Sequence, residues 1–341
     1  MSTAPHIQTV PSPEIIFDTL NAHQRTAALR AAVELDLFTA IGGGAVTVPA
    51  IAQHIQASEK GTRVLCDFLT IIGFLTKDGR EYGLTPSSAA FLNRNSPAYL
   101  GTVAHFLSNP DITAPFSDLA AVVRKGGTTM PGEGTVEPNN PVWVDFARSM
   151  APLMAFPAQL IAELLGASSG APWKVLDIAA GHGLFGIAIA QKNPNAQIAA
   201  LDWEAVLAVA AENAARAGVS ARHSLKPGSA FDVDFGTGYD VVLITNFLHH
   251  FDTRTNETFL KKVHTALAPG GRAVTLDFVP NDDRVSPPTP AMFSMMMLGS
   301  TAHGDAYTFS ELDQMLRNAG FISSEMHKLE PLPQSVVVSY K

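Results

Sequence analysis

VLDIAAGHGLFG, residues 175–186, joins a short apolar run to a glycine-rich turn and then to a second apolar stretch. Gly181, Gly183 and Gly186 follow the G-x-G-x-x-G spacing, in which glycines permit a tight turn and let the backbone approach a ligand closely. The pattern predicts a strand, a turn and a helix that form a nucleotide-type pocket. The same spacing also occurs in strand–helix turns that bind nothing.

The ligand of such a pocket is either a dinucleotide or S-adenosylmethionine (SAM). A dinucleotide rests its anionic pyrophosphate on the helix N-terminus, whereas SAM carries no phosphate. Asp177 stands four residues before the first glycine, where a carboxylate favours the cationic methionyl end of SAM and disfavours pyrophosphate. The motif also lies in mid-chain, after a long N-terminal half of different composition. Both observations favour SAM.

Length and composition limit the possible functions. A chain of 341 residues with 46% hydrophobic residues suggests two domains with full cores. The net charge of -8 argues against binding nucleic acid or an anionic membrane by charge, which leaves small molecules or proteins as partners. The single cysteine, Cys66, can build neither an intrachain disulfide nor a Cys-based zinc site, so we expect no metal.

The sequence has no feature that predicts export or membrane insertion. Its N-terminus lacks a basic region followed by an apolar core, and no apolar run reaches the ~18 to 20 residues of a membrane span. Together with the cysteine usage, this predicts a soluble cytoplasmic protein.

The N-terminal half reads as a helical domain. Residues 14–41 repeat apolar side chains at helical spacing, which predicts one or two amphipathic helices that end at the glycine triplet 42–44. Residues 47–92 predict a winged helix-turn-helix with these parts: helix 49–55, helix 59–72, strand 74–77 and strand 81–84. We expect a mobile tail at 1–13, the winged-helix domain at 14–105, a linker or lid at 106–142 and a further domain at 143–341.

A winged helix either binds DNA or serves self-association. Residues 47–92 carry four basic and four acidic side chains, so they lack the basic footprint that DNA binding requires. We therefore expect this domain to form a homodimer.

The C-terminal domain is predicted to be α/β. After the glycine turn, apolar strands and helical segments alternate, which implies a parallel sheet covered by helices on both faces. Two strands near 324–329 and 335–340 flank a proline-containing turn and predict a terminal antiparallel hairpin. Seven strands that close on a hairpin are the arrangement of SAM-dependent methyltransferases.

The whole chain resembles the plant-type and bacterial small-molecule O-methyltransferases, which pair an N-terminal winged-helix dimerisation domain with a Rossmann-like SAM domain. The matching stretches, in order, are ELDLFTAI (34–41), YGLTPSSAAFL (82–92), FARSM (146–150), VLDIAAGHGLFG (175–186), LDW (201–203), PGSAF (227–231), TNFLHHFD (245–252), ALAPGGRAVTLDFVP (266–280) and YTFSELDQMLRNAGF (307–321). The implied fold is a seven-stranded Rossmann-like sheet with an antiparallel last strand.

The cofactor residues follow from the motif and from this resemblance. Asp202 ends the second strand about 20 residues past the turn, where a carboxylate can take both ribose hydroxyls. Trp203 stacks on adenine or simply packs. The family usually holds adenine with an acidic residue and a methionine, but here Ser229 and Ala230 stand there, so Phe231 is the remaining candidate. The resemblance also assigns Thr245 and Asn246 to the cofactor site, beside Asp177, Gly181 and Gly183.

The resemblance implies that His249 is the general base of methyl transfer to a hydroxyl. An imidazole suits this role because its unperturbed pKa of ~6.5 lies near working pH. Asp277 matches the first of two family acids that orient the histidine, whereas Ala306 stands in place of the second, with His303 and Asp305 nearby. His250 stands where the family usually has aspartate, and we expect a structural role for it.

The acceptor pocket is predicted to be apolar and adaptable. Its expected lining is Met150, Met154, Phe293, Met296 and Met297, a set that suits a flat aromatic or polycyclic acceptor. We expect O-methylation of a small aromatic or polyketide-like metabolite. The alternatives are a SAM-assisted reaction without methylation, which the missing acid suggests, and a ligand-responsive DNA-binding protein that has lost catalysis.

Overall fold

The computed structural model describes residues 11–341, so all but the last three residues of the expected N-terminal tail lie outside the described residues. The chain forms two compact units that divide between residues 105 and 106. Within residues 11–341, no helix has the length and apolarity that a membrane span requires.

The N-terminal unit contains the expected helices and hairpin. Its elements are α1 (Glu14–Glu34), α2 (Leu37–Gly42), α3 (Val48–His54), α4 (Glu59–Ile71), β1 (Leu75–Asp78), β2 (Glu81–Leu84) and α5 (Pro86–Phe91). Ser58 begins α4 by accepting a hydrogen bond from the Gly61 N–H, and Thr85 accepts one from the Ser88 N–H at the start of α5. The strands β1 and β2 pair antiparallel, as a wing requires.

A carboxylate joins this wing to α4. Asp67 on α4 accepts hydrogen bonds from Lys77 on β1 and from the Tyr82 hydroxyl on β2, the latter at 2.7 Å. These two donors lower the pKa of the Asp67 carboxyl to about 2. Because Tyr82 is also part of the apolar core of the unit, the polar contact fixes the wing against that core.

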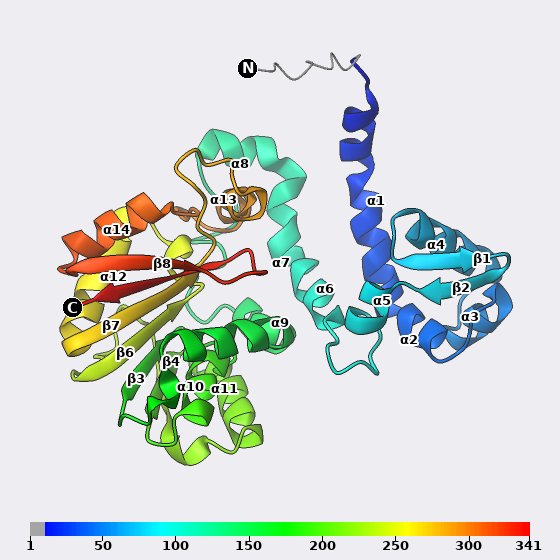
Figure 1. Cartoon of the computed structure of the whole chain (residues 1–341). Coiled ribbons are helices and arrows are strands. Elements are labelled where there is room, and N and C mark those ends of the chain that lie inside the picture. Colours follow the sequence, from blue (N-terminus) through cyan, green and yellow to red (C-terminus); the bar gives the residue numbers. More distant parts are fainter. Residues whose placement is uncertain (1–10) are drawn as a thin grey trace, which may run out of the picture. The chain divides into compact units, whose positions relative to one another are not determined.

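The C-terminal unit is built on a seven-stranded sheet, as predicted. Within residues 11–341 the strand order is β5-β4-β3-β6-β7-β9-β8. The strands are β3 (Lys174–Ile178), β4 (Gln197–Asp202), β5 (His223–Pro227), β6 (Tyr239–Thr245), β7 (Leu267–Asp277), β8 (Ser323–Lys328) and β9 (Ser335–Tyr340). Strands β3 to β7 pair parallel, and β9 runs antiparallel to both β7 and β8. The β8–β9 hairpin is coloured red in Figure 1.

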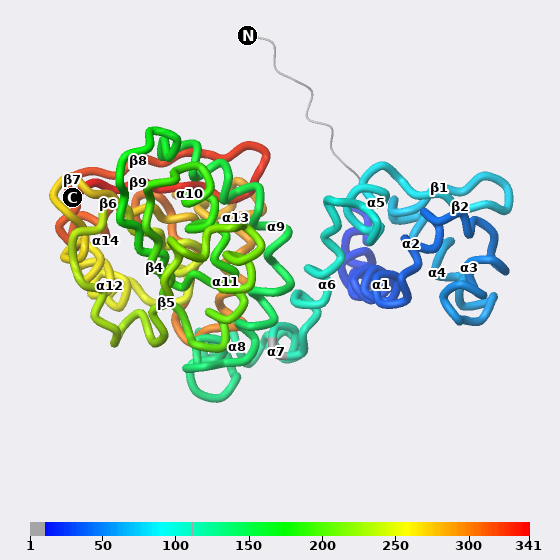
Figure 2. The backbone as a smooth tube through the Cα atoms, turned by 90° about the horizontal axis from the view of Figure 1, so that it is seen from below, coloured from blue at the N-terminus to red at the C-terminus, as the bar shows by residue number. Residues whose placement is uncertain are grey.

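Helices cover both faces of this sheet. Its longer helices are α9 (Val142–Leu164), α10 (Leu184–Lys192), α11 (Glu204–Arg216), α12 (Thr253–Ala266), α13 (Pro288–Ser300) and α14 (Phe309–Asn318). Figure 2 shows α9, α10 and α11 on one face and α12 and α14 on the other. A large apolar core lies between the sheet and α12 and α14, and includes Phe259, Leu316 and Val337.

Residues 106–142, expected as a loop-rich linker or lid, contain more helix than the sequence indicated. Within this segment lie α7 (Pro110–Thr113), a 3-10 turn at 114–118 and α8 (Leu119–Lys125). The part without helix is fixed to the end of α13, because the Thr128 N–H donates to Thr301 O at 2.8 Å and the Thr135 N–H donates to Ser300 O at 2.9 Å. The glycine-rich sequence of this segment predicted its irregular backbone, but it did not predict these long-range contacts.

Candidate active site

The glycine turn connects β3 to α10 at the carboxyl edge of the sheet. Gly183 has φ +73°, and a Cβ there would lie 2.9 Å from the Ala210 Cβ on α11. A Cβ on Gly186 would lie 2.7 Å from Ile198 Cγ2 on β4. Gly183 is therefore required by backbone conformation and by packing, and Gly186 by the close approach of α10 to the sheet.

Asp177 lies in β3 and is completely buried. One of its carboxylate oxygens accepts the Gly186 N–H at 3.0 Å, and the other oxygen has no hydrogen-bond partner. Burial raises the pKa of the Asp177 carboxyl to about 7, although the Gly186 N–H opposes the shift. The side chain ties the end of β3 to the first turn of α10.

Asp202 at the end of β4 reaches the same turn. Its Oδ2 accepts the Gly181 N–H at 2.8 Å, and its Oδ1 accepts the Trp203 N–H at 2.7 Å. Burial raises the pKa of the Asp202 carboxyl to about 6. Each oxygen keeps a further lone pair, so the carboxylate can also accept from a ligand. The structure thus brings Asp177, Gly181 and Asp202 together.

The other residues predicted at the adenine end are less enclosed. Trp203, like Trp143, packs against a small apolar cluster between α9 and α11. The Phe231 side chain is 39% exposed and meets the Phe251 ring edge-on, with a centroid separation of 4.9 Å. Ser229 accepts the Phe231 N–H through its hydroxyl, and Ala230 is buried. Lys262 on α12 donates to the Ala230 and Phe231 carbonyls and so holds this loop.

Thr245 is the last residue of β6, and Asn246 follows it. Thr245 is buried, and Asn246 adopts φ +53°, a left-handed conformation that asparagine tolerates. Asn246 Oδ1 accepts a 2.6 Å hydrogen bond from Gln334 Nε2, and Asn246 Nδ2 lies 4.0 Å from Met154 Sδ. Gln334 belongs to the turn before β9 and was missed by sequence reasoning, because no local pattern marks it.

His249 and Asp277 form the central polar pair of the site. The Nδ1 of His249 and the Oδ1 of Asp277 are 2.6 Å apart, and both side chains are buried. His249 lies in the 3-10 turn Leu248–His250 after β6, and Asp277 is the last residue of β7. The pairing follows from topology, since β6 and β7 are adjacent parallel strands that end at the same edge.

His250 packs against the base candidate. Its ring lies 4.3 Å from the His249 ring and 5.1 Å from the Trp143 ring, measured between centroids. Burial and the neighbouring His249 hold the pKa of the His250 imidazole well below its usual value. The ring is therefore neutral and lies among aromatic neighbours, and its structural role stays a prediction.

Aromatic side chains lie beside this pair. The Phe293 ring on α13 meets the His249 ring edge-on at 4.9 Å and stacks on Phe278 at 4.1 Å. Phe278 directly follows Asp277 and was not predicted as a site residue. The methionines predicted at the acceptor pocket differ in exposure: Met150, Met154 and Met297 are buried, and Met296 is partly exposed.

Among residues 11–341, no second acid is hydrogen-bonded to the His249 imidazole. Ala306 is completely buried and His303 is exposed. The carboxylate of Asp305 pairs with Arg284 at 3.1 Å instead of reaching His249. Asp305 nevertheless contacts the base turn through its main chain, because its N–H donates to His249 O at 2.9 Å.

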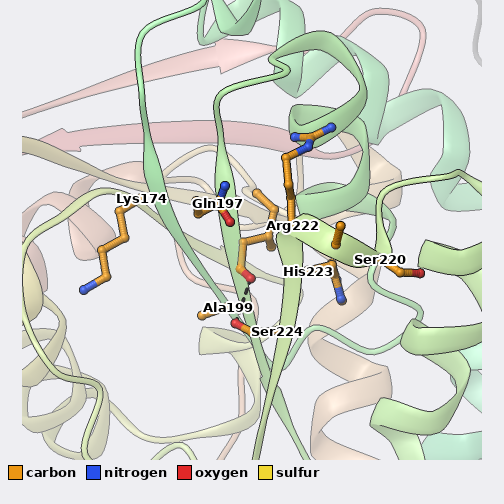
Figure 3. Close-up of a pocket in the computed structure, with 9 residues that line it drawn as sticks. Lys174, Gln197, Ala199, Ser220, Arg222, His223 and Ser224 are labelled. Carbon is orange, nitrogen blue, oxygen red and sulfur yellow. Dashed lines mark hydrogen bonds between the residues drawn. The ribbon is translucent and has the colours of Figure 1, made fainter.

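A surface hollow lies at the opposite edge of the sheet (Figure 3). Its lining includes Lys174, Gln197 and His223, the first residues of β3, β4 and β5. Arg222 in this hollow already donates to the carbonyls of Ala190, Asn193 and Ala196. Ligands of parallel sheets bind at the carboxyl ends of the strands, so we assign the candidate site to the edge that carries Asp177, Asp202 and His249.

Comparisons with known proteins agree with this architecture. Residues 17–94 match the family model described as an O-methyltransferase dimerisation domain, and residues 176–273 match that of a methyltransferase domain. A crystal structure described as an O-methyltransferase from Nostoc punctiforme shares 54% sequence identity over 97% of this chain and 100% of that one, with a TM-score of 0.95. The chain belongs to the O-methyltransferase family.

Two Streptomyces relatives are more distant. A 3-hydroxy-5-methyl-1-naphthoate 3-O-methyltransferase from Streptomyces sahachiroi is 28% identical over 90% of this chain and 89% of its own length. A tetracenomycin polyketide synthesis 8-O-methyl transferase from Streptomyces glaucescens is 26% identical over 93% of each chain. The protein is a SAM-dependent O-methyltransferase of the kind that acts in secondary metabolism.

The ligand groups of the glycine turn suit the charge of SAM. Asp177 and Asp202 are held close together by the turn, and Asp177 retains a buried carboxylate oxygen without a hydrogen-bond partner. Two neighbouring carboxyl groups would repel a pyrophosphate but favour a sulfonium and an ammonium group. This donor set argues against a dinucleotide on the same turn.

We expect SAM binding to release protons near pH 6. The raised pKa values leave the Asp177 carboxyl largely protonated and the Asp202 carboxyl about half protonated there, and a bound cation favours their charged forms. SAM affinity should therefore rise with pH from about 5 to about 8. Titration calorimetry at pH 6 in two buffers of different ionisation enthalpy checks this result. S-adenosylhomocysteine, which lacks the sulfonium charge, should release fewer protons, and equal SAM heats in both buffers would contradict the linkage.

Proposed function

We propose that this enzyme methylates a hydroxyl group of a small aromatic or polyketide-like metabolite, with His249 as general base and Asp277 as the residue that orients it. The observation that carries the proposal is the buried 2.6 Å contact between His249 Nδ1 and Asp277 Oδ1. A buried His–carboxylate pair beside an apolar acceptor wall suits the removal of a proton from a phenol.

SAM would be held by the glycine turn and by Asp202, and when bound it supplies an electrophilic methyl group. Asp202 has lone pairs available for the ribose hydroxyls. Asp177 keeps the turn in place through the Gly186 N–H and would ionise as the cationic methionyl end binds. Phe231 offers an exposed aromatic edge for the adenine end.

Asp277 sets the tautomer of the base. An ionised carboxylate only accepts hydrogen bonds, so the neutral imidazole directs its Nδ1–H toward Asp277 and carries its lone pair on Nε2. That lone pair takes the proton of the acceptor hydroxyl. Asp277 then stabilises the imidazolium that forms, and the Phe278 N–H, which donates to the same carboxylate oxygen at 2.8 Å, keeps the carboxylate oriented.

The acceptor class follows from the surfaces beside the base. Phe293 and its stacked partner Phe278 offer a flat apolar wall, and buried methionines adapt to ring systems of different shape. The named relatives act on a naphthoate and in polyketide synthesis, which supports an aromatic or polyketide-like acceptor here. Proximity of base, acceptor and methyl donor then provides the alignment that the displacement needs.

Replacing the base should nearly abolish turnover. A panel of phenols and naphthols, incubated with methyl-labelled SAM, identifies an acceptor for wild type. With that acceptor, His249→Ala should lower kcat by about 10²- to 10⁴-fold, the usual contribution of one general base. Asp277→Asn should also lower kcat, because the amide carries no charge to stabilise the imidazolium.

The matched control is His303→Ala, which removes an exposed imidazole that follows α13. It should methylate the acceptor at close to the wild-type rate. A His249→Ala enzyme as fast as wild type would remove His249 from the mechanism. No transfer to any phenol would direct attention to a SAM-assisted reaction of another type.

Asp202 should matter for binding more than for chemistry. Asp202→Ala removes a carboxylate that would accept hydrogen bonds from the ribose, so we expect the free energy of SAM binding to weaken by about 1–3 kcal/mol. Calorimetry with SAM measures this change directly. Asp232→Ala is a suitable control on the next loop, and an unchanged dissociation constant in Asp202→Ala would exclude the ribose assignment.

We also propose that the enzyme is a homodimer formed through residues 14–105. The match of residues 17–94 to a dimerisation domain supports this assembly. At the start of α1, Ile15, Phe17 and Leu20 expose 74%, 61% and 66% of their surfaces. Large exposed apolar side chains gathered at one end of a helix favour contact with another protein surface.

Light scattering should give twice the chain mass of 36.2 kDa at micromolar concentration. Charged substitutions Phe17→Asp and Leu20→Asp, made together, should shift the enzyme toward monomer, because burying two carboxylates in an apolar contact is costly. Ile322→Asp, at a 71% exposed residue of the C-terminal unit, serves as the control. A monomeric wild type would refute the dimer.

A further inference from the structure

Hydrogen-bond donors from other segments hold the turn that carries His249 by binding its backbone carbonyl groups. Asn256 on α12 donates through Nδ2 to Leu248 O at 2.9 Å, and the Tyr307 hydroxyl donates to Phe251 O at 2.6 Å. Between these two contacts, the Asp305 N–H donates to His249 O at 2.9 Å. Two of the three donors come from residues 304–307, which we call the clamp segment.

The clamp segment lies unusually close to the base turn. A Cβ on Gly304 would lie 2.3 Å from His249 O and 3.1 Å from the His250 carbonyl carbon, so this position accepts only glycine. The Gly304 N–H donates to Thr301 Oγ1 at 2.8 Å, which ties the segment to the end of α13. The two backbones are therefore packed so closely that no side chain fits between them.

An ion pair secures the outer side of the clamp segment. Asp305 Oδ1 accepts the Ala306 N–H at 2.8 Å, and Asp305 Oδ2 pairs with Arg284 Nη1 at 3.1 Å. The second guanidinium nitrogen of Arg284 contacts Glu311, whose carboxylate also accepts the Thr308 N–H at the start of α14. Arg284 thus connects the clamp segment to a capped helix.

We propose that Tyr307, and Asp305 together with Arg284, are positioning residues for methyl transfer. Asp305 holds the main chain of His249 itself, and Tyr307 holds the same turn at Phe251. This inference rests on the proposed function, in which His249 is the base. The imidazole has Asp277 as its carboxylate partner, and Ala306 adds none where the family has a second acid. The clamp segment supplies the missing restraint through backbone carbonyls instead of through the ring.

Loss of the clamp should reduce turnover without loss of SAM binding. A displacement of the base by about 1 Å can cost on the order of 10²-fold in rate, whereas the glycine turn and Asp202 lie on other strands. Tyr307→Phe removes one hydroxyl, and Arg284→Gln removes the ion pair while keeping a polar side chain of similar length.

Each variant has a matched control elsewhere in the sheet domain. Tyr239→Phe also removes a buried hydroxyl that donates to a main-chain carbonyl, that of Phe235 at 2.9 Å, but at the end of β6 opposite to the base turn. Arg317→Gln breaks the exposed pair with Asp313 within α14. These controls separate a general loss of stability from a loss of base alignment.

The test measures kcat and KM with the acceptor selected from the phenol panel, and the SAM dissociation constant by calorimetry. Tyr307→Phe and Arg284→Gln should lower kcat roughly tenfold with the SAM dissociation constant unchanged. The two control variants should keep wild-type kcat at similar shifts in melting temperature. Arg284→Lys, which retains the charge, should recover part of the loss.

A spectroscopic readout tests the same inference without an acceptor. A short His–carboxylate hydrogen bond gives a downfield proton resonance, and in Tyr307→Phe this signal from His249 should broaden, while Tyr239→Phe leaves it sharp. Unchanged kcat and an unchanged resonance in Tyr307→Phe and Arg284→Gln would overturn the clamp. Equal loss of kcat in Tyr239→Phe would also overturn it. Full activity of His249→Ala would instead refute the proposed function.

Discussion

The hydrogen bond from the Gly186 N–H to the buried carboxylate of Asp177 connects the end of β3 to the first turn of α10. If the buried carboxyl group lost this donor, the fold would lose more free energy than an ordinary hydrogen bond contributes. The bond therefore fixes the direction in which α10 leaves β3. The glycine at 186 also lets α10 lie against Ile198 of β4. Asp202 at the end of β4 can therefore reach the Gly181 N–H, and the cofactor turn depends on both carboxylates.

Burial favours the uncharged forms of several ionisable side chains in the site. Desolvation raises the pKa values of Asp177 and Asp202. It lowers the pKa of His182 to about 4, and it also lowers the pKa of His250. A pocket with little fixed charge can accept a cation by releasing protons, without the self-repulsion that several ionised carboxylates would cause. His182 contributes to this balance from within the glycine turn, where its ring stacks on Phe146 of α9.

Sequence reasoning predicted those parts of the site that periodicity and strand order determine. The sheet and the winged helix follow from apolar patterning. The pairing of His249 with Asp277 was implied by the family resemblance, and the structure accounts for it by two adjacent parallel strands. Sequence reasoning did not predict contacts made by side chains distant in sequence, such as Gln334 on Asn246 or Tyr307 on Phe251. Such contacts depend on tertiary packing, and a lone glutamine or tyrosine carries no spacing that would indicate them.

The position of β9 between β7 and β8 has a consequence for biosynthesis. During translation, β7 emerges long before β9, and until the hairpin docks, the strand that ends in Asp277 has an open, apolar edge. Such edges pair readily with other chains. Catalytic competence is thus acquired late, and a nascent chain stalled between these strands would be a substrate for chaperones rather than an early, partly active enzyme.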